Sequence, residues 1–155
     1  MTGSINSRLG ELGIRLPEPP NALANYAPYV IVGNLVQVSG QIPIGPNGLE
    51  YTGKVGVDIS LEEARKAARL CAINLVAQAR HACGGDLDRV RRVVKLGGFV
   101  SCTDGFDQHP GVINAASDLM VDIFGDIGRH ARFAVGANSL PLNAAVEIDG
   151  IFEIA

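Results

Sequence analysis

HARFAVGANSLPLNAAVEIDGIFEI, residues 130–154, has the clearest strand pattern in the chain. In its second half, apolar residues alternate with charged ones, which is the period of a strand with one buried face. The segment 132–137 is short, apolar and β-prone, and a proline and an asparagine between the two favour a tight connection. We therefore expect two paired strands, one opened by Arg132 and the other containing Asp149. An acid and a base that face one cleft are suited to catalysis.

The composition is that of a compact soluble protein. The chain has 155 residues, of which 47% are hydrophobic and 19% charged, so one domain can bury a sizeable core without a metal or disulfide bonds. The formal net charge of −3 gives no field that attracts a polyanion, which counts against nucleic acid as the main partner. No apolar run approaches the length of about 18 residues that a membrane span needs, and the N-terminus lacks a signal pattern. We expect a cytoplasmic protein with no membrane partner.

The cysteines and histidines form no pattern that indicates a metal site. They are Cys71, Cys83 and Cys102, and His81, His109 and His130. The cysteines are odd in number and form no C-x-x-C pair, so we expect reduced packing residues and no disulfide framework. The histidines lack the spacing of metal ligands. These residues therefore indicate no metal, and we expect no organic cofactor either.

Three further strands are indicated earlier in the chain. Two apolar, β-branched runs, residues 29–32 and 35–39, flank Gly33-Asn34, which has the turn chemistry of a hairpin. Residues 92–102 form another apolar run, with Gly97-Gly98 in its middle. Because two glycines weaken a strand, we expect a bulge or the close approach of another chain at that point.

Helix signals separate these strands. The tetrapeptide Ser60-Leu61-Glu62-Glu63 is a capping box, and small apolar residues then recur every three or four positions until Gly84-Gly85 ends the helix. A second helix is expected from residue 107 to 125, with a proline in its first turn. A short helix over residues 4–14, begun by a capping-type serine, precedes a proline-rich arm. This order predicts an α+β domain with both long helices on one face of a mixed sheet.

Several stretches in one order carry a family resemblance. They are Ala27-Pro28-Tyr29, Val38-Ser39-Gly40-Gln41-Ile42-Pro43, Val94-Lys95 with Phe99-Val100, Val112-Ile113-Asn114, Ala131-Arg132 with Val135, Leu140-Pro141, and Val146-Glu147-Ile148. Over residues 26–155 the chain resembles the RidA/YjgF family of reactive-intermediate (enamine and imine) deaminases, some of whose members are called L-PSP endoribonucleases or translation inhibitors. Residues 1–25 are then an N-terminal helix and proline-rich arm that precede the RidA/YjgF-like domain.

The resemblance implies an assembly as well as a fold. It implies a chorismate-mutase-like α+β fold and a homotrimer whose sheets line the interior of a barrel, with active clefts between neighbouring subunits. The residues support part of this independently, because a single sheet with helices on one side leaves its other face uncovered. We expect that face to meet another copy of the chain.

The resemblance also implies hydrolytic deamination of small 2-imino or 2-enamino acids to 2-keto acids and ammonia. Arg132 matches the arginine that holds the substrate carboxylate, for which the planar guanidinium fork is well suited. Asp149 falls where many members carry a glutamate that positions water or passes protons. The other matching positions are Tyr29 at the cleft mouth, Ser39 and Gly40 in the cleft wall, and Asn114 near the site.

The chain departs from the family pattern at three places, which indicates a divergent subgroup. Asp149 is one methylene shorter than the family glutamate, and a shift of about 1 Å in a catalytic group can cost about 100-fold in rate. Ala134 stands where many deaminating members have a cysteine. The loop between Thr103 and His109 is longer than the common form.

Each candidate residue also has a purely structural interpretation. Arg132 could pair with a carboxylate at the strand edge, Asp149 could lie on a solvated face, and Tyr29 could belong to the core. Ser39 could cap a turn and Asn114 could tie a loop. The alternative function is a non-catalytic trimer that binds a small carboxylate metabolite, while the acidic balance disfavours RNA cleavage.

Overall fold

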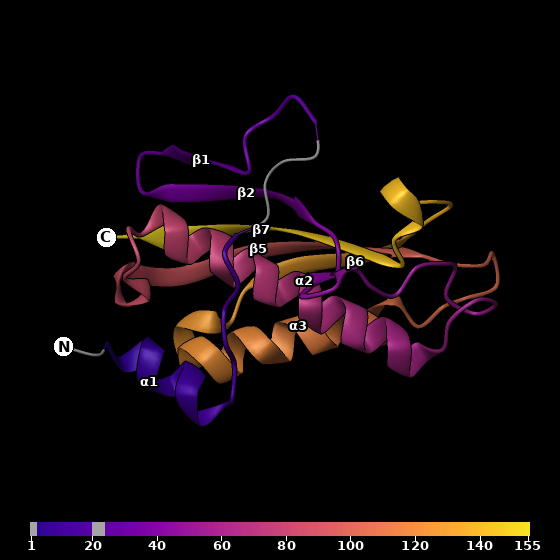
Figure 1. The fold of residues 1–155 in the computed structure, drawn as a ribbon, viewed down its shortest axis with the longest axis horizontal. Coiled ribbons are helices and arrows are strands. Elements are labelled where there is room, and N and C mark those ends of the chain that lie inside the picture. Colours follow the sequence, from indigo (N-terminus) through magenta and orange to yellow (C-terminus); the bar gives the residue numbers. More distant parts are fainter. Residues whose placement is uncertain (1–2, 20–23) are drawn as a thin grey trace.

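The computed structural model describes residues 3–19 and 24–155, which form a five-stranded sheet, a two-stranded ribbon and three α-helices (Figure 1). In chain order the elements are α1 (Ser4–Glu11), β1 (Tyr29–Val32), β2 (Leu35–Gln41), β3 (Ile44–Gly45), β4 (Gly48–Leu49), α2 (Leu61–Ala82), the 3₁₀ turn η1 (Leu87–Arg89), β5 (Val90–Ser101), α3 (His109–Phe124), η2 (Gly125–Gly128), β6 (Ala131–Ala137), η3 (Pro141–Asn143) and β7 (Val146–Ile154). The strands and helices expected from the sequence are all present.

The five-stranded sheet has the order β1-β2-β7-β5-β6. Strand β6 runs parallel to β5, and the other neighbouring pairs are antiparallel, so the sheet is mixed. Helices α2 and α3 lie side by side against one face of the sheet, and none of the described helices covers the opposite face (Figure 1). The predicted α+β class, with both long helices on one face, is confirmed.

Strands β6 and β7 are not paired with each other, because β5 lies between them. The expected tight connection between two paired strands is therefore wrong. The reason is that β6 follows β5 through α3 as a parallel crossover, which moves it to the edge of the sheet. The chain must then pass the end of β5 to reach β7, and it does so through η3, where Leu142 and Asn143 have positive φ angles of 57° and 61°.

The core lies between the two long helices and the sheet. Helix α2 presents a stripe of small side chains that includes Ala68, Cys71 and Leu75, all fully buried. These side chains face the central strand β7, whose Ile148 and Phe152 are also fully buried. Small residues on α2 let the helix approach the sheet closely while the larger strand residues fill the space.

Both ends of α2 form as the sequence predicts. The Ser60 hydroxyl accepts a hydrogen bond from the Glu63 backbone N–H (3.1 Å), and the Glu63 carboxylate accepts one from the Ser60 backbone N–H (3.2 Å). Gly84 and Gly85 follow the helix with φ angles of 66° and 96°, a conformation that ends a helix at little cost in a residue without Cβ.

Gly97 and Gly98 lie in a regular part of β5, so a bulge at this position is wrong, while the alternative, the close approach of another chain, stays a prediction. A Cβ on Gly98 would lie 2.6 Å from Ile113 of α3, and the glycine therefore lets that helix pack against the strand. A Cβ on Gly97 would lie 2.6 Å from the Phe133 ring on the other face. The irregularities in β5 occur earlier, between residues 90 and 95.

Helix α1 is capped by a residue far along the chain. The Asp88 carboxylate, in η1, accepts hydrogen bonds of 3.0 Å from the backbone N–H groups of Ser4 and Ile5. The N-cap is Gly3, which has no side chain for the purpose, so the expected capping serine is wrong. Leu9 of α1 joins the same core as the sheet. Residues 20–23 of the proline-rich arm lie outside the described residues, and the division after residue 25 stays a prediction.

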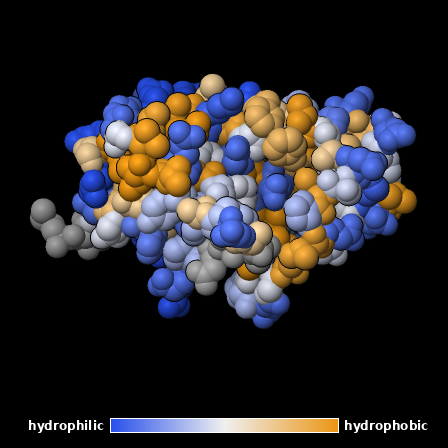
Figure 2. Space-filling view, turned by 90° about the horizontal axis from the view of Figure 1, so that it is seen from above, coloured by the Kyte–Doolittle hydropathy of each residue, from blue (hydrophilic) through white to orange (hydrophobic). Residues whose placement is uncertain are grey.

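The uncovered face of the sheet mixes apolar and charged side chains. The residues that face it, two apart along each strand, are Val30, Val32, Leu35, Gln37, Lys95, Phe99, Phe133, Val135, Glu147, Asp149, Ile151 and Glu153. Seen from the side on which β1 lies, apolar side chains gather at the end of the molecule that carries this strand (Figure 2). Three residues of β1, Val30, Ile31 and Val32, are exposed. Such a face is suited to contact with another protein surface.

Candidate functional site

Arg132 lies at the start of β6 and points toward α3. Its register partner on β5 is Leu96, which is fully buried under the helices, so Arg132 belongs to the helix-facing side of the sheet. The Arg132 guanidinium donates from Nη1 to the Ser117 hydroxyl (3.0 Å) and from Nη2 to the Pro110 carbonyl (3.4 Å). Both partners belong to α3, so this helix fixes the orientation of the guanidinium.

A cavity of about 290 Å³ lies beside this guanidinium. Its lining residues are Asn114, Ser117, Asp118, Val121, Arg129, His130 and Arg132. Asn114 lies one helical turn before Ser117 and on the same face of α3. The structure therefore brings Arg132 and Asn114 together, as two of the candidate binding residues. Among the described residues, no carboxylate lies within 4.0 Å of the Arg132 guanidinium.

Ser117 and His130 complete a hydrogen-bonded cluster with Arg132. The His130 Nε2 lies 2.9 Å from the Ser117 Oγ, and the His130 Nδ1 lies 2.7 Å from the Gly128 carbonyl oxygen. Sequence reasoning missed both residues, because their separation by 13 positions is no recognisable motif. The available signal was the position of His130 two residues before Arg132 in an extended segment, a spacing that favours the same side for both side chains.

Asp149 lies in the middle of β7 on the uncovered face of the sheet. Its carboxyl group lies over Gly97, next to the Phe133 ring. The resulting burial raises the pKa of Asp149, while a hydrogen bond with the Gly97 backbone and the charge of Lys95 act in the opposite direction. Glu147, two residues earlier on the same face, also has a raised pKa, first because of burial and then because of the Asp149 charge.

Arg132 and Asp149 do not face one cleft within a single chain. Gly97 on β5 pairs with Asp149, whereas the preceding residue, Leu96, pairs with Arg132. Neighbouring residues on a strand point to opposite faces, so the sheet separates the two side chains. A cleft that contains both side chains therefore needs more than one copy of the chain, and the expected clefts between subunits stay a prediction.

Tyr29, Ser39 and Gly40 lie in β1 and β2, away from the cavity beside Arg132. The Tyr29 hydroxyl is 2.7 Å from the His81 Nδ1 of α2, and the Ser39 hydroxyl donates to the Ala27 carbonyl (2.7 Å). A Cβ on Gly40 would lie 3.0 Å from the Glu147 carboxyl carbon, so this glycine adjoins the acidic side of β7. These three residues form no joint site with Arg132 in one chain.

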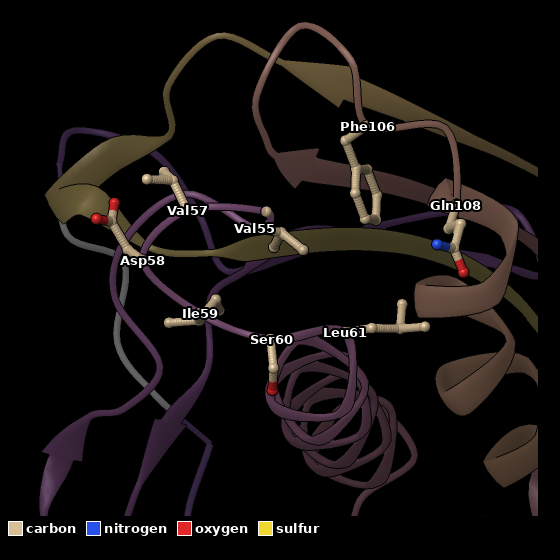
Figure 3. Close-up of a pocket in the computed structure, with 9 residues that line it drawn as sticks. Val55, Val57, Asp58, Ile59, Ser60, Leu61, Phe106 and Gln108 are labelled. Atoms are coloured by element: carbon tan, nitrogen blue, oxygen red, sulfur yellow. The ribbon is translucent and has the colours of Figure 1, made fainter.

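The loop after β5 forms the wall of a second cavity, of about 470 Å³ (Figure 3). Phe106 and Gln108 from this loop face Val55 and Leu61 from the segment that leads into α2, as Figure 3 shows. The sequence predicts that this loop is longer than the common family form. Together with the segment before α2, it lines a hollow of mixed polar and apolar character next to the first turns of the two long helices.

The described residues contain no group of three His, Cys, Asp or Glu side chains arranged as metal ligands. Within the same part of the chain, no helix combines the length and apolar character needed to cross a membrane.

Comparison with known proteins places this fold in a family. The family described as "YjgF/chorismate mutase-like, putative endoribonuclease" matches residues 6–153. Protein TCP17 of Trypanosoma cruzi is 44% identical over 154 residues, which cover 99% of this chain and 96% of that protein.

Two crystal structures are similar over nearly the whole length. The protein Atu1372 of Agrobacterium tumefaciens, described as having unknown function, is 50% identical with a TM-score of 0.91, over 97% of this chain and 92% of that one. A protein of Shewanella oneidensis described as a "putative endoribonuclease" is 37% identical with a TM-score of 0.94, over 98% and 100% of the two chains. The fold and the sequence together show that the chain belongs to the YjgF/chorismate-mutase-like family, as the resemblance had indicated.

Proposed function

We propose that the protein binds a small carboxylate at Arg132 and hydrolyses 2-imino or 2-enamino acids to 2-keto acids and ammonia. One observation carries the proposal: the Arg132 guanidinium lines a cavity of about 290 Å³ and has no carboxylate partner among the described residues. An arginine that lines a cavity and has no carboxylate partner can bind an anionic group there. The size of the cavity suits a ligand of a few carbon atoms.

The hydrogen bonds of Arg132 support a carboxylate ligand in particular. The guanidinium uses two N–H groups for Ser117 and Pro110, and its other N–H groups are left for a planar anion. Charge-assisted bidentate bonds between arginine and carboxylate are stronger and more directional than bonds to neutral groups. A related structure, E. coli TdcF, contains bound serine, which also carries a carboxylate; that protein is 25% identical to this chain.

The acid–base role of Asp149 requires more than one copy of the chain. We infer a homotrimer in which the uncovered sheet face of one subunit meets the next and brings a second subunit's Asp149 toward Arg132. The apolar residues on that face, among them Phe133 and Ile151, support such a contact. In the same arrangement, Tyr29, Ser39 and Gly40 contribute the wall of the cleft. Asp149 then orients the water that attacks the imine carbon.

The test is release of keto acid from a 2-imino acid generated in place by an amino acid oxidase. The variant Arg132→Ala should lose most of the rate at low substrate concentration, because the carboxylate loses its binding group. Arg132→Lys should retain only part of it, since lysine cannot bind bidentately. Arg91→Ala, which removes an exposed arginine of the same sheet that does not line the cavity, is the matched control. An unchanged rate in Arg132→Ala contradicts the role of Arg132.

A non-catalytic binding protein is the second candidate. It is favoured by the separation of Arg132 and Asp149 on opposite faces of the single chain. Calorimetric binding of a 2-keto acid to wild-type protein, lost in Arg132→Ala and accompanied by no turnover of the imino acid, would decide for this candidate. RNA cleavage has less support, because the net charge of −3 opposes the binding of a polyanion.

A further inference from the structure

Ser117 and His130 lie beside Arg132, and the proposed function assigns them no chemical step. Ser117 comes from the middle of α3 and His130 from the residue before β6, so two separate elements present them to the same cavity. The Ser117 Oγ is within hydrogen-bond distance of both His130 Nε2 (2.9 Å) and Arg132 Nη1 (3.0 Å).

The surroundings of His130 fix the direction of these hydrogen bonds. The Gly128 carbonyl oxygen can only accept, so the His130 Nδ1 at 2.7 Å carries the proton. In the neutral imidazole, Nε2 is then the acceptor, and the Ser117 hydroxyl donates to it. The guanidinium donates to the same hydroxyl oxygen from the other side. A hydroxyl whose proton points to a histidine that a third group orients is the arrangement of an activated serine.

We propose that Ser117 and His130 are the proton-transfer pair of the Arg132 site. This inference rests on the proposed function and names two further residues for the same reaction. Both residues come from the same subunit as Arg132. The Asp149 of that subunit lies on the other side of the sheet, so it cannot serve this site.

The pair acts on the intermediate that forms when water has added to the imine carbon. This intermediate carries a hydroxyl and an amino group on one carbon, and its breakdown requires a proton to leave the oxygen and another to reach the nitrogen. Ser117 Oγ accepts the hydroxyl proton while its own proton moves to His130 Nε2. The proton then returns from His130 through Ser117 to the amino nitrogen. As the carbon–oxygen double bond forms, the carbon–nitrogen bond breaks with its electron pair moving to the protonated nitrogen, which leaves as ammonia.

Arg132 has a second part in this step. A guanidinium that donates to the Ser117 oxygen stabilises the negative charge that develops there as the proton moves toward His130. The same contact ties the reacting hydroxyl to the group that binds the substrate carboxylate, so the distance between the bound substrate and the proton carrier is fixed. Ser117 exchanges protons directly with the substrate in this step. His130 does not contact the substrate and acts only through Ser117, so it is a positioning residue.

The experiment compares keto-acid release by wild type, Ser117→Ala, Ser117→Thr and His130→Ala. We expect kcat to fall about 100-fold or more in Ser117→Ala and His130→Ala, the usual size of an acid–base contribution, with a much smaller change in KM. Ser117→Thr keeps the hydroxyl and should keep most of kcat. Added imidazole should restore part of kcat in His130→Ala, because it can occupy the space of the missing ring. Imidazole should not restore Arg132→Ala, which serves as the control.

The outcomes separate this inference from the proposed function. If wild-type protein releases no keto acid, the proposed function fails and this inference fails with it. If wild type is active and the alanine variants keep its kcat, or if His130→Ala shows no response to imidazole, this inference alone is overturned. Melting curves of every variant identify a folding defect, and should His130→Ala not fold, His130→Gln replaces it in the kcat comparison with the same expected loss.

Discussion

Arg132 and Asp149 lie on opposite faces of one sheet, because they pair with consecutive residues of β5, Leu96 and Gly97. A mechanism that uses both side chains therefore needs Arg132 from one subunit and Asp149 from another. This relationship makes the assembly a condition of the proposed chemistry, and it leads directly to a mixing experiment.

Two inactive variants should restore activity when they assemble together. In a ring of three subunits with each site shared by neighbours, any trimer that contains both Arg132→Ala and Asp149→Asn subunits has one complete site. Random mixing at equal amounts makes about three quarters of the trimers mixed, so about a quarter of the wild-type activity is expected. The measurement is keto-acid release after unfolding and refolding the mixture, and each variant treated alone is the control. Light scattering should give about three times the chain mass of 16.2 kDa.

Failure of this complementation would identify a different arrangement. A mixture as inactive as its components, from a protein whose mass is that of a trimer, would mean that Arg132 and Asp149 do not share a site. A mass near 16.2 kDa would contradict the trimer itself.

Asp88 should control the docking of α1. Its carboxylate accepts hydrogen bonds from the Ile5 and Ser4 backbone, and these bonds lower the pKa of Asp88. A carboxyl group whose pKa is lower in the folded protein than in the unfolded chain stabilises the folded state at any pH above its unfolded-state pKa. This stabilisation is lost as the pH falls through the folded-state pKa. Asp88→Ala should therefore lower Tm at neutral pH and speed amide hydrogen exchange in α1. Asp126→Ala, another exposed aspartate, should leave exchange in α1 unchanged.

Glu147 should destabilise the single chain as the pH rises. Burial, and then the Asp149 charge, raise the pKa of Glu147 above its ordinary value of 4.5. The contribution of Glu147 to the free energy of unfolding is fully present below the pKa that this group has in the unfolded chain. It is lost as the pH rises through the pKa that the group has in the folded protein. In a monomeric state at low concentration, Glu147→Gln should therefore raise Tm near pH 7 and have little effect near about pH 4. Thermal melts of wild type and Glu147→Gln across this pH range measure the direction of the Tm difference. A higher Tm for wild type than for Glu147→Gln at pH 7 would contradict the prediction.

Gly98 should accept a side chain only with a loss of stability. A Cβ there would lie 2.6 Å from Ile113 of α3, so Gly98→Ala is expected to cost about 1–3 kcal/mol of unfolding free energy. Gly10, in α1, has no atom within 4 Å of the corresponding position, and Gly10→Ala should stabilise the protein by up to about 1 kcal/mol. Urea denaturation of the two variants compares them directly. Equal effects of the two substitutions would mean that α3 moves away from the strand at low cost.

The sequence was sufficient for the elements whose signals are local. The capping box at Ser60, the stop at Gly84 and the alternation through β7 each depend on residues a few positions apart, and all three are present as predicted. Strand alternation also identified the buried face of β7 correctly. It does not identify a strand's neighbours, however, which is why the pairing of β6 with β7 was predicted wrongly.

The candidate site was only partly predictable for the same reason. Arg132 and Asn114 could be found from the motifs that contain them, and the cavity brings them together. The contact between Ser117 and His130 depends on α3 lying across the start of β6, which is a property of tertiary packing. The cap of α1 by Asp88 joins residues 84 positions apart and has no local signal either.

The position of β7 has a consequence for how the protein is made. This strand follows every other strand in the chain, yet it lies between β2 and β5 and holds the two parts of the sheet together. While the ribosome is still adding the residues of β7, the β1–β2 hairpin and the β5–α3–β6 unit have no shared strand. The nascent chain can therefore close its sheet only after β7 has emerged, and until then the edges of β2 and β5 are open to chaperones or to wrong partners.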